Sequence, residues 1–411
     1  MAVHRRGARA RGRAAAGILA AVAVLAPALL AGCAPPPRPD TTAADVQRLL
    51  DLRARALLDR DERGYLEVLD PAATGLRAAE RRQFTRLARV PLGSWAYRLG
   101  PVGHRAGGRV VAGAELSYRL AGHDPGPVTT GRELELARDA GGGWRITADR
   151  PAPGAAEQLW QQGDVQVVRG GASLVLGVGQ PAARLRAIAR TADRSVPAVA
   201  RSWPSPWAGR VVVLVPRTLD DMGALLGAPA AGYRGIAAVT TGATGTREEV
   251  PADRVIVNPA AYGALGDFGK QIVLTHETAH VATRTHTSGT TPMWLSEGFA
   301  DWVAYRGSGR TAGRIAPELQ RAVRRGQPPA VLPADADFSF TGDADALARA
   351  YEGGWLACEL IAGRWGERKL IAFYREAARS PLPVAFSRVL GTTPESFTTA
   401  WRAYLTDRLS P

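Results

Sequence analysis

The chain has 411 residues, of which 46% are hydrophobic and 22% are charged, a composition typical of soluble globular proteins and unlike that of disordered ones. The formal net charge of +14 comes almost wholly from arginine, because Lys270 and Lys369 are the only lysines. These arginines are scattered along the chain and accompany no nucleic-acid-binding motif, so we expect no nucleic-acid partner.

Residues 1–32 have the layout of a secretory signal. Five arginines precede an apolar run from Ala14 to Ala31, as in a charged n-region followed by an h-region. The run ends in Leu-Ala-Gly-Cys33, which resembles the lipobox of bacterial lipoproteins, whose cysteine becomes the lipidated first residue. The resemblance implies export and anchoring to the outer face of the cytoplasmic membrane through Cys33. The alternative is a transmembrane anchor, which the short run and Pro27 disfavour.

A proline-rich segment at residues 33–42 follows, and it predicts an extended tether. The mature chain can form no internal disulfide, because Cys358 is the only cysteine besides Cys33. Cys358 lies in an apolar stretch and is expected to be a buried small hydrophobe. We expect the chain to be a monomer.

Residues 43–155 predict a small α+β domain. Helical periodicity is followed by a two-residue period between Gly, Pro and Asp turns. The expected elements are helices at 43–60 and 78–88 and strands at 95–99, 110–120, 132–137 and 144–146. Helices followed by a strand meander resemble the cone-shaped NTF2-like fold, whose members include enzymes, ligand pockets and adaptors.

Residues 165–411 predict a second α+β domain, after a Pro/Gly break at 151–154. A mixed sheet with intervening helices comes first, then a long helix, then a mainly helical part that begins at Pro292 and has a looser stretch at 326–345. The expected elements are strands at 165–168, 173–176, 210–216, 235–240 and 254–258, and helices at 181–200, 219–226 and 268–284.

The stretch HETAHVATRTH places three histidines within the end of the long helix and its continuation. His276 and His280 are four residues apart, so on a helix both imidazoles can reach one metal ion. Glu277 is offset by about 100° and can address a water on that ion. H-E-x-x-H thus offers two zinc ligands and a general base.

The third ligand has two candidates. His286 has the spacing of the metzincin motif, but Thr283 stands where that family has a turn-making glycine. Glu297 lies beside an apolar helical stripe, where a carboxylate is costly to bury without a cation. "WLSEGFADW" resembles the "WLNEGFA" helix of M1-type gluzincin peptidases, whose Glu is the third zinc ligand. The connection from His280 is two residues shorter than is usual in that family. We favour Glu297.

The gluzincin resemblance implies a zincin-like fold for residues 165–411, a Zn²⁺ cofactor and two further roles. Asp301, one turn after Glu297, matches the acid that in thermolysin-like gluzincins accepts a hydrogen bond from a zinc-bound histidine. Tyr351, in "YEGG", matches the "YEKG" tyrosine that donates to the oxyanion of peptide hydrolysis. Gly353 replaces the lysine of that motif.

The strand expected at 235–240 lacks the acid of the "GAMEN" strand, which binds the free amine of substrates in M1 aminopeptidases. Its backbone, at Ala237 and Ala238, can still pair with an extended peptide. We therefore expect a zinc endopeptidase that acts on a peptide or protein. Two alternatives remain open: a catalytically silent zinc-containing binding lipoprotein, and an aminopeptidase with a different amine anchor.

Overall fold

The computed structural model describes residues 40–242, 252–340 and 343–410. The expected signal segment, Cys33 and residues 34–39 of the tether lie outside these ranges. Thr41–Pro411 form one compact unit of mixed α and β structure. No helix within the described ranges is both long and apolar enough to span a membrane.

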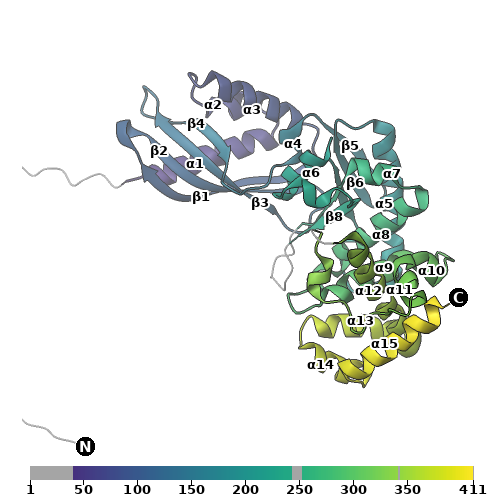
Figure 1. Cartoon of the computed structure of the whole chain (residues 1–411). Coiled ribbons are helices and arrows are strands. Elements are labelled where there is room, and N and C mark those ends of the chain that lie inside the picture. The colour runs from purple at the N-terminus through teal and green to yellow at the C-terminus, as the bar shows by residue number, and fades with distance from the viewer. Residues whose placement is uncertain (1–39, 243–251, 341–342, 411) are drawn as a thin grey trace, which may run out of the picture. The chain divides into compact units, whose positions relative to one another are not determined.

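The first part of this unit is three helices and a four-stranded antiparallel sheet with the strand order β1-β2-β3-β4 (Figure 1). Alternate residues of β2 are buried, as its two-residue period predicts. The elements are α1 (Thr42–Leu58), α2 (Glu62–Glu67), α3 (Thr74–Leu87), β1 (Leu92–His104), a short 3₁₀ turn (Ala106–Gly108), β2 (Val110–Leu120), β3 (Val128–Arg138) and β4 (Trp144–Pro151).

Two details of this part differ from expectation. Helix α2 has too few residues to show a helical period. Strand β1 is far longer than the expected strand at 95–99, because its register shifts between Leu99 and Val102 and so carries Gly100 and Pro101 within the strand.

Charged side chains occupy the interior between these helices and the sheet. Arg53 is fully buried, and its guanidinium lies 2.7 Å from both Glu80 and Asp149. Tyr65 donates a 2.6 Å hydrogen bond to Glu80. Buried charges persist when they are paired in this way. An ion-pair network therefore fills the interior between these helices and the sheet.

The second sheet has the order β5-β6-β7-β9-β8. The three central strands are parallel, and both edge strands are antiparallel to their neighbours. The strands are β5 (Val165–Arg169), β6 (Ser173–Val178), β7 (Val211–Val215), β8 (Ala238–Thr241) and β9 (Arg254–Val257). The helices among them are α4 (Leu159–Gln162), α5 (Ala182–Ser202), α6 (Leu219–Leu226), a 3₁₀ turn (Ala230–Tyr233), α7 (Pro259–Ala264) and α8 (Asp267–Thr283).

Strand β8 corrects one predicted boundary. It begins at Ala238, so Ala237 precedes it, although the Ala237 carbonyl accepts a 2.9 Å hydrogen bond from the Asn258 amide. As an edge strand, β8 leaves one side of its backbone without a strand partner in the described structure. Helix α8 matches the predicted 268–284 to within one residue at each end.

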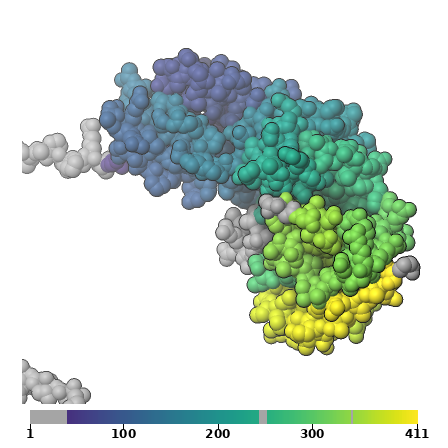
Figure 2. All heavy atoms as spheres, viewed as in Figure 1, coloured from purple at the N-terminus to yellow at the C-terminus, as the bar shows by residue number. Residues whose placement is uncertain are grey.

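The chain after Pro292 is helical, as predicted, and its atoms gather in one body, green to yellow in Figure 2. Its core contains Cys358, which is fully buried, and an aromatic cluster. The looser stretch at 326–345 contains one 3₁₀ turn (Asp335–Phe338) before α12 begins. The helices are α9 (Met293–Tyr305), α10 (Ala312–Ile315), α11 (Pro317–Arg324), α12 (Ala344–Trp365), α13 (Glu367–Ala377), α14 (Leu382–Ala385), with a π turn (Phe386–Leu390), and α15 (Pro394–Leu409).

Helices α9 and α12 touch at two glycines. A Cβ atom on Gly298 would lie 2.2 Å from the carbonyl of Gly354, and one on Gly354 would lie 2.5 Å from the carbonyl oxygen of Trp294. Only glycine permits so close an approach of two backbones. The contact fixes α9, which carries Glu297, against α12, which carries Tyr351.

Candidate active site

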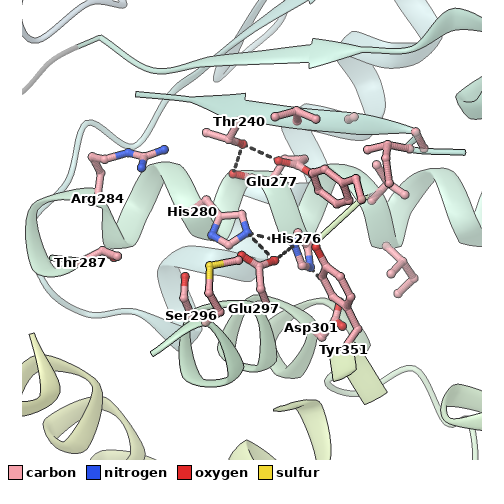
Figure 3. A pocket seen from close by; sticks show the side chains of 18 of the residues that line it. Thr240, His276, Glu277, His280, Arg284, Thr287, Ser296, Glu297, Asp301 and Tyr351 are labelled. Carbon is pink, nitrogen blue, oxygen red and sulfur yellow. Dashed lines mark hydrogen bonds and ion pairs between the residues drawn. The ribbon is translucent and has the colours of Figure 1, made fainter. Parts of the chain in front are cut away.

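Helix α8 presents His276 and His280 on one face. Their rings lie with centroids 4.7 Å apart and nearly perpendicular, and their Nε2 atoms are 3.0 Å apart. Helix α9 crosses α8 and brings in Glu297, whose Oε2 lies 3.2 Å from Nε2 of His276 and 3.4 Å from Nε2 of His280. Figure 3 shows the three side chains converging.

This triangle of donor atoms fits a zinc ion. Two ligands at zinc distances of 2.0–2.1 Å in a tetrahedron are about 3.3 Å apart, and the three observed separations are 3.0, 3.2 and 3.4 Å. Two imidazoles and one carboxylate are also a common ligand set of catalytic zinc sites. His276, His280 and Glu297 can therefore hold one zinc ion and leave a fourth position open.

Electrostatics around the triangle agree with a cation site. Burial alone would raise the pKa of Glu297, but His280 and His276 hold it well below its ordinary value. Burial alone would lower the pKa of His276, but the carboxylates of Asp301 and Glu297 raise it. Two carboxylates therefore place negative charge next to His276, and a bound cation would offset this charge.

Asp301 lies on the far side of His276 from the triangle. Its Oδ1 is 2.7 Å from Nδ1 of His276, a distance at which Nδ1–H donates to the carboxylate and Nε2 is left free as a ligand. The structure thus brings Asp301 to the atom that the gluzincin resemblance implies.

Glu277 points from α8 toward β8, beside the triangle (Figure 3). Its Oε2 accepts a 2.6 Å hydrogen bond from the hydroxyl of Thr240, which also lies 3.1 Å from the backbone oxygen of Glu277. Glu277 is buried. The sequence does not predict this role of Thr240. The contact with Glu277 forms only when the strand packs on the helix, and a single threonine in an apolar strand does not indicate such a contact.

Tyr351 reaches the site from α12. Its ring centroid is 6.3 Å from that of His276, and Phe338 packs edge-on against it with ring centroids 5.2 Å apart. Burial, followed by the charges of Glu297 and Asp301, raises the pKa of Tyr351 far above its ordinary value. The hydroxyl therefore keeps its proton and is available as a hydrogen-bond donor.

The triangle opens into a cleft of about 710 Å³ between β8, α8 and α9. Ala237 and Ala238 line its β8 side. Along the N-terminal half of α8 its wall includes the apolar residues Leu265, Ile272 and Val273. At the C-terminal end of α8 the wall is polar, with Arg284, Thr287 and Ser288. The two ends of the cleft thus differ in chemistry.

His286 is not part of the triangle, and it is not among the residues that line the cleft, although Thr287 and Ser288 directly after it are. It follows α8 in a 3₁₀ turn and packs edge-on against Trp203, with ring centroids 5.3 Å apart. Thr283 is helical, with φ of −86°, so the chain makes no metzincin-like turn there. The aromatic contact with Trp203 holds His286 in place.

No protein-family model matches the chain, and no curated protein matches it. Among solved structures, the chain is similar to the crystal structure of a mutant two-domain M1 zinc metallopeptidase bound to L-arginine. The sequence identity is 14% and the TM-score is 0.35. The match covers 77% of this chain, which spans 62% of the length of that protein.

Proposed function

We propose that the chain is a zinc-dependent peptidase of the gluzincin class, in which His276, His280 and Glu297 hold one zinc ion. The observation that carries the proposal is the triangle of donor atoms with Glu277 directly beside it. A structural zinc site is closed by four protein ligands and needs no base. Three converging ligands, an adjacent carboxylate and an open cleft are the arrangement of a catalytic site.

A zinc ion in this position would lower the pKa of its water and polarise a carbonyl oxygen. Glu277 can take the proton from the attacking water and return it to the leaving amine. Tyr351, which keeps its proton, can donate a hydrogen bond to the oxygen that becomes negative. Asp301 holds the ring and tautomer of His276.

The free edge of β8 supports binding of an extended peptide by backbone hydrogen bonds, with Ala237 and Ala238 at the contact. No acid lies on that strand to bind a free amine, so we propose internal cleavage. A library of peptides blocked at both ends tests this. Cleavage at internal bonds is expected, whereas activity only on free amino termini would overturn internal cleavage. In that case Asp335, a further carboxylate in the cleft, would be the candidate that binds the free amine.

We further propose that Cys33 carries a lipid and anchors the enzyme to the outer face of the membrane, with residues 43–155 as an NTF2-like adaptor. The lipobox-like sequence supports the anchor, and the ion pairs of Arg53 inside the domain support an adaptor over a ligand pocket. Labelled fatty acid should enter the protein in cells and be lost in Cys33→Ser. Equal labelling of both proteins would overturn the anchor.

A further inference from the structure

Arg284 closes the polar end of the cleft. It is 9% exposed, and it lies directly after α8, whose last turn carries His280. Its Nε donates a 2.8 Å hydrogen bond to Asp253, whose side chain is also buried. Figure 3 shows Arg284 at the end of the helix, on the side that faces β8.

The pairing with Asp253 uses one edge of the guanidinium only. Among the described residues, no hydrogen bond or ion pair engages the two η nitrogens of Arg284. Arg284 is one of the residues that line the cleft. The pair of Asp253 and Arg284 therefore turns a fork of donors toward the cleft.

A fork of two guanidinium nitrogens matches a carboxylate, which it can bind with two parallel hydrogen bonds. At the opposite, apolar end of the cleft the wall residues Leu265, Ile272 and Val273 carry no charge. Arg284 therefore makes the polar end of the cleft the end that can bind an anion.

Strand β8 sets the side of the substrate that meets Arg284. After passing Glu277 at Thr240, the chain reaches Gly242, which lies against the side chains of Asp253 and Arg284. Strand β8 therefore runs toward Arg284. A peptide paired antiparallel to β8, the more stable of the two pairings, runs away from Arg284 and places its amino-terminal part there.

We propose that Arg284 recognises an acidic side chain of the substrate on the amino-terminal side of the cleaved bond. The substrate class is then an extended peptide with Glu or Asp upstream of the bond. This inference rests on the proposed peptidase function, and it assigns to Arg284 a role in specificity with no part in the chemical step.

The test compares blocked peptides that carry Glu or Gln at successive positions on both sides of the cleaved bond. Hydrolysis is measured with the full-length protein, and binding is measured by calorimetry with its Glu277→Gln variant. An upstream Glu should raise kcat/KM and binding about tenfold over Gln, as expected for a hydrogen-bonded charge pair. Arg284→Gln should abolish this ratio, and Arg284→Lys should keep part of it.

Two further variants control for folding and for charge. Arg284→Gln combined with Asp253→Asn leaves no carboxylate without its partner, so a lost ratio there cannot come from a buried charge. Arg201→Gln removes an exposed arginine of α5 outside the cleft and should keep the ratio.

A ratio of one in the parent protein, a ratio that survives loss of Arg284, or a preference for Glu only downstream would each overturn the proposal. Hydrolysis without any Glu preference would refute this inference alone, whereas neither hydrolysis nor binding of any peptide would refute the peptidase function as well.

Discussion

The hydroxyl of Thr240 on the edge strand donates a 2.6 Å hydrogen bond to the carboxylate of Glu277 on α8. The strand that we propose to bind substrate therefore also holds the proposed base. The bond restricts Glu277 to one orientation beside the triangle. Misplacing a catalytic base by about 1 Å can greatly lower the reaction rate.

Thr240→Val keeps the shape of the side chain but removes the donor. We expect kcat for peptide hydrolysis to fall by about 10- to 100-fold with little change in KM or zinc content. Thr240→Ser restores the hydroxyl and should restore most of kcat. A rise in KM together with the fall in kcat, or an equal loss of kcat in both variants, would show that Thr240 supports the strand and not the base.

Gly298→Ala should destabilise the protein, because its methyl group would enter the carbonyl of Gly354. Overpacking of this kind costs about 1–3 kcal/mol, and urea denaturation measures it. Gly363→Ala is the matched control: Gly363 lies on the same helix α12 as Gly354, and nothing lies within 4 Å of the added methyl group. That variant should be as stable as the parent protein or more stable, and an equal loss in both would contradict the close helix contact.

Asp301→Asn should weaken zinc binding by about 10- to 100-fold, because the charge that orients His276 and increases its basicity is lost. Competition with a zinc-binding dye measures the affinity. Asp335→Asn is the control, since Asp335 also lines the cleft but accepts its hydrogen bond from the Met293 amide. Equal affinities in the parent and Asp301→Asn would remove Asp301 from the site.

Glu352 predicts a pH dependence of stability. It is 9% exposed, and burial raises its pKa from 4.5 to about 7, although it accepts a hydrogen bond from the Leu319 amide. Between these two values the folded protein holds a proton that the unfolded chain releases. The contribution of Glu352 to stability is therefore complete below pH 4.5 and is lost as the pH rises through 7.

The slope attributable to Glu352 should approach about −1.4 kcal/mol per pH unit. Denaturation of the parent protein and of Glu352→Gln between pH 5 and pH 8 measures it as the difference between the two curves. Parallel curves would show that the pKa of Glu352 is the same in the folded and unfolded states.

Residues close together in the sequence allowed the best predictions. His276, Glu277 and His280 are set by helical spacing, and Glu297 stood out as a carboxylate beside an apolar stripe. The predicted helix that carries the histidines agrees with α8 because its period extends over several turns. The role of Asp301 was implied by the gluzincin resemblance, at a position one turn after Glu297. Helical spacing relates residues of one helix only, and it is the contact of α9 with α8 that brings Glu297 and Asp301 to His276.

Contacts between distant segments could not be predicted in this way. The partner of Arg284 is Asp253, and that of Arg254 is Asp124, which lies 130 residues away. Such pairs form only when sheets and helices dock, and an arginine-rich chain offers many equivalent partners for each acid. The bond from Thr240 to Glu277 was missed for the same reason.

The most direct test of the proposed site compares residues 41–411, the compact unit, with the same chain carrying Glu277→Gln. Zinc content and hydrolysis of blocked peptides are measured for both. We predict about one zinc ion per chain in each protein, because Glu277 is not a ligand, and hydrolysis by the parent chain only. Equal hydrolysis by the two proteins, or no hydrolysis by either at full zinc occupancy, would contradict the account.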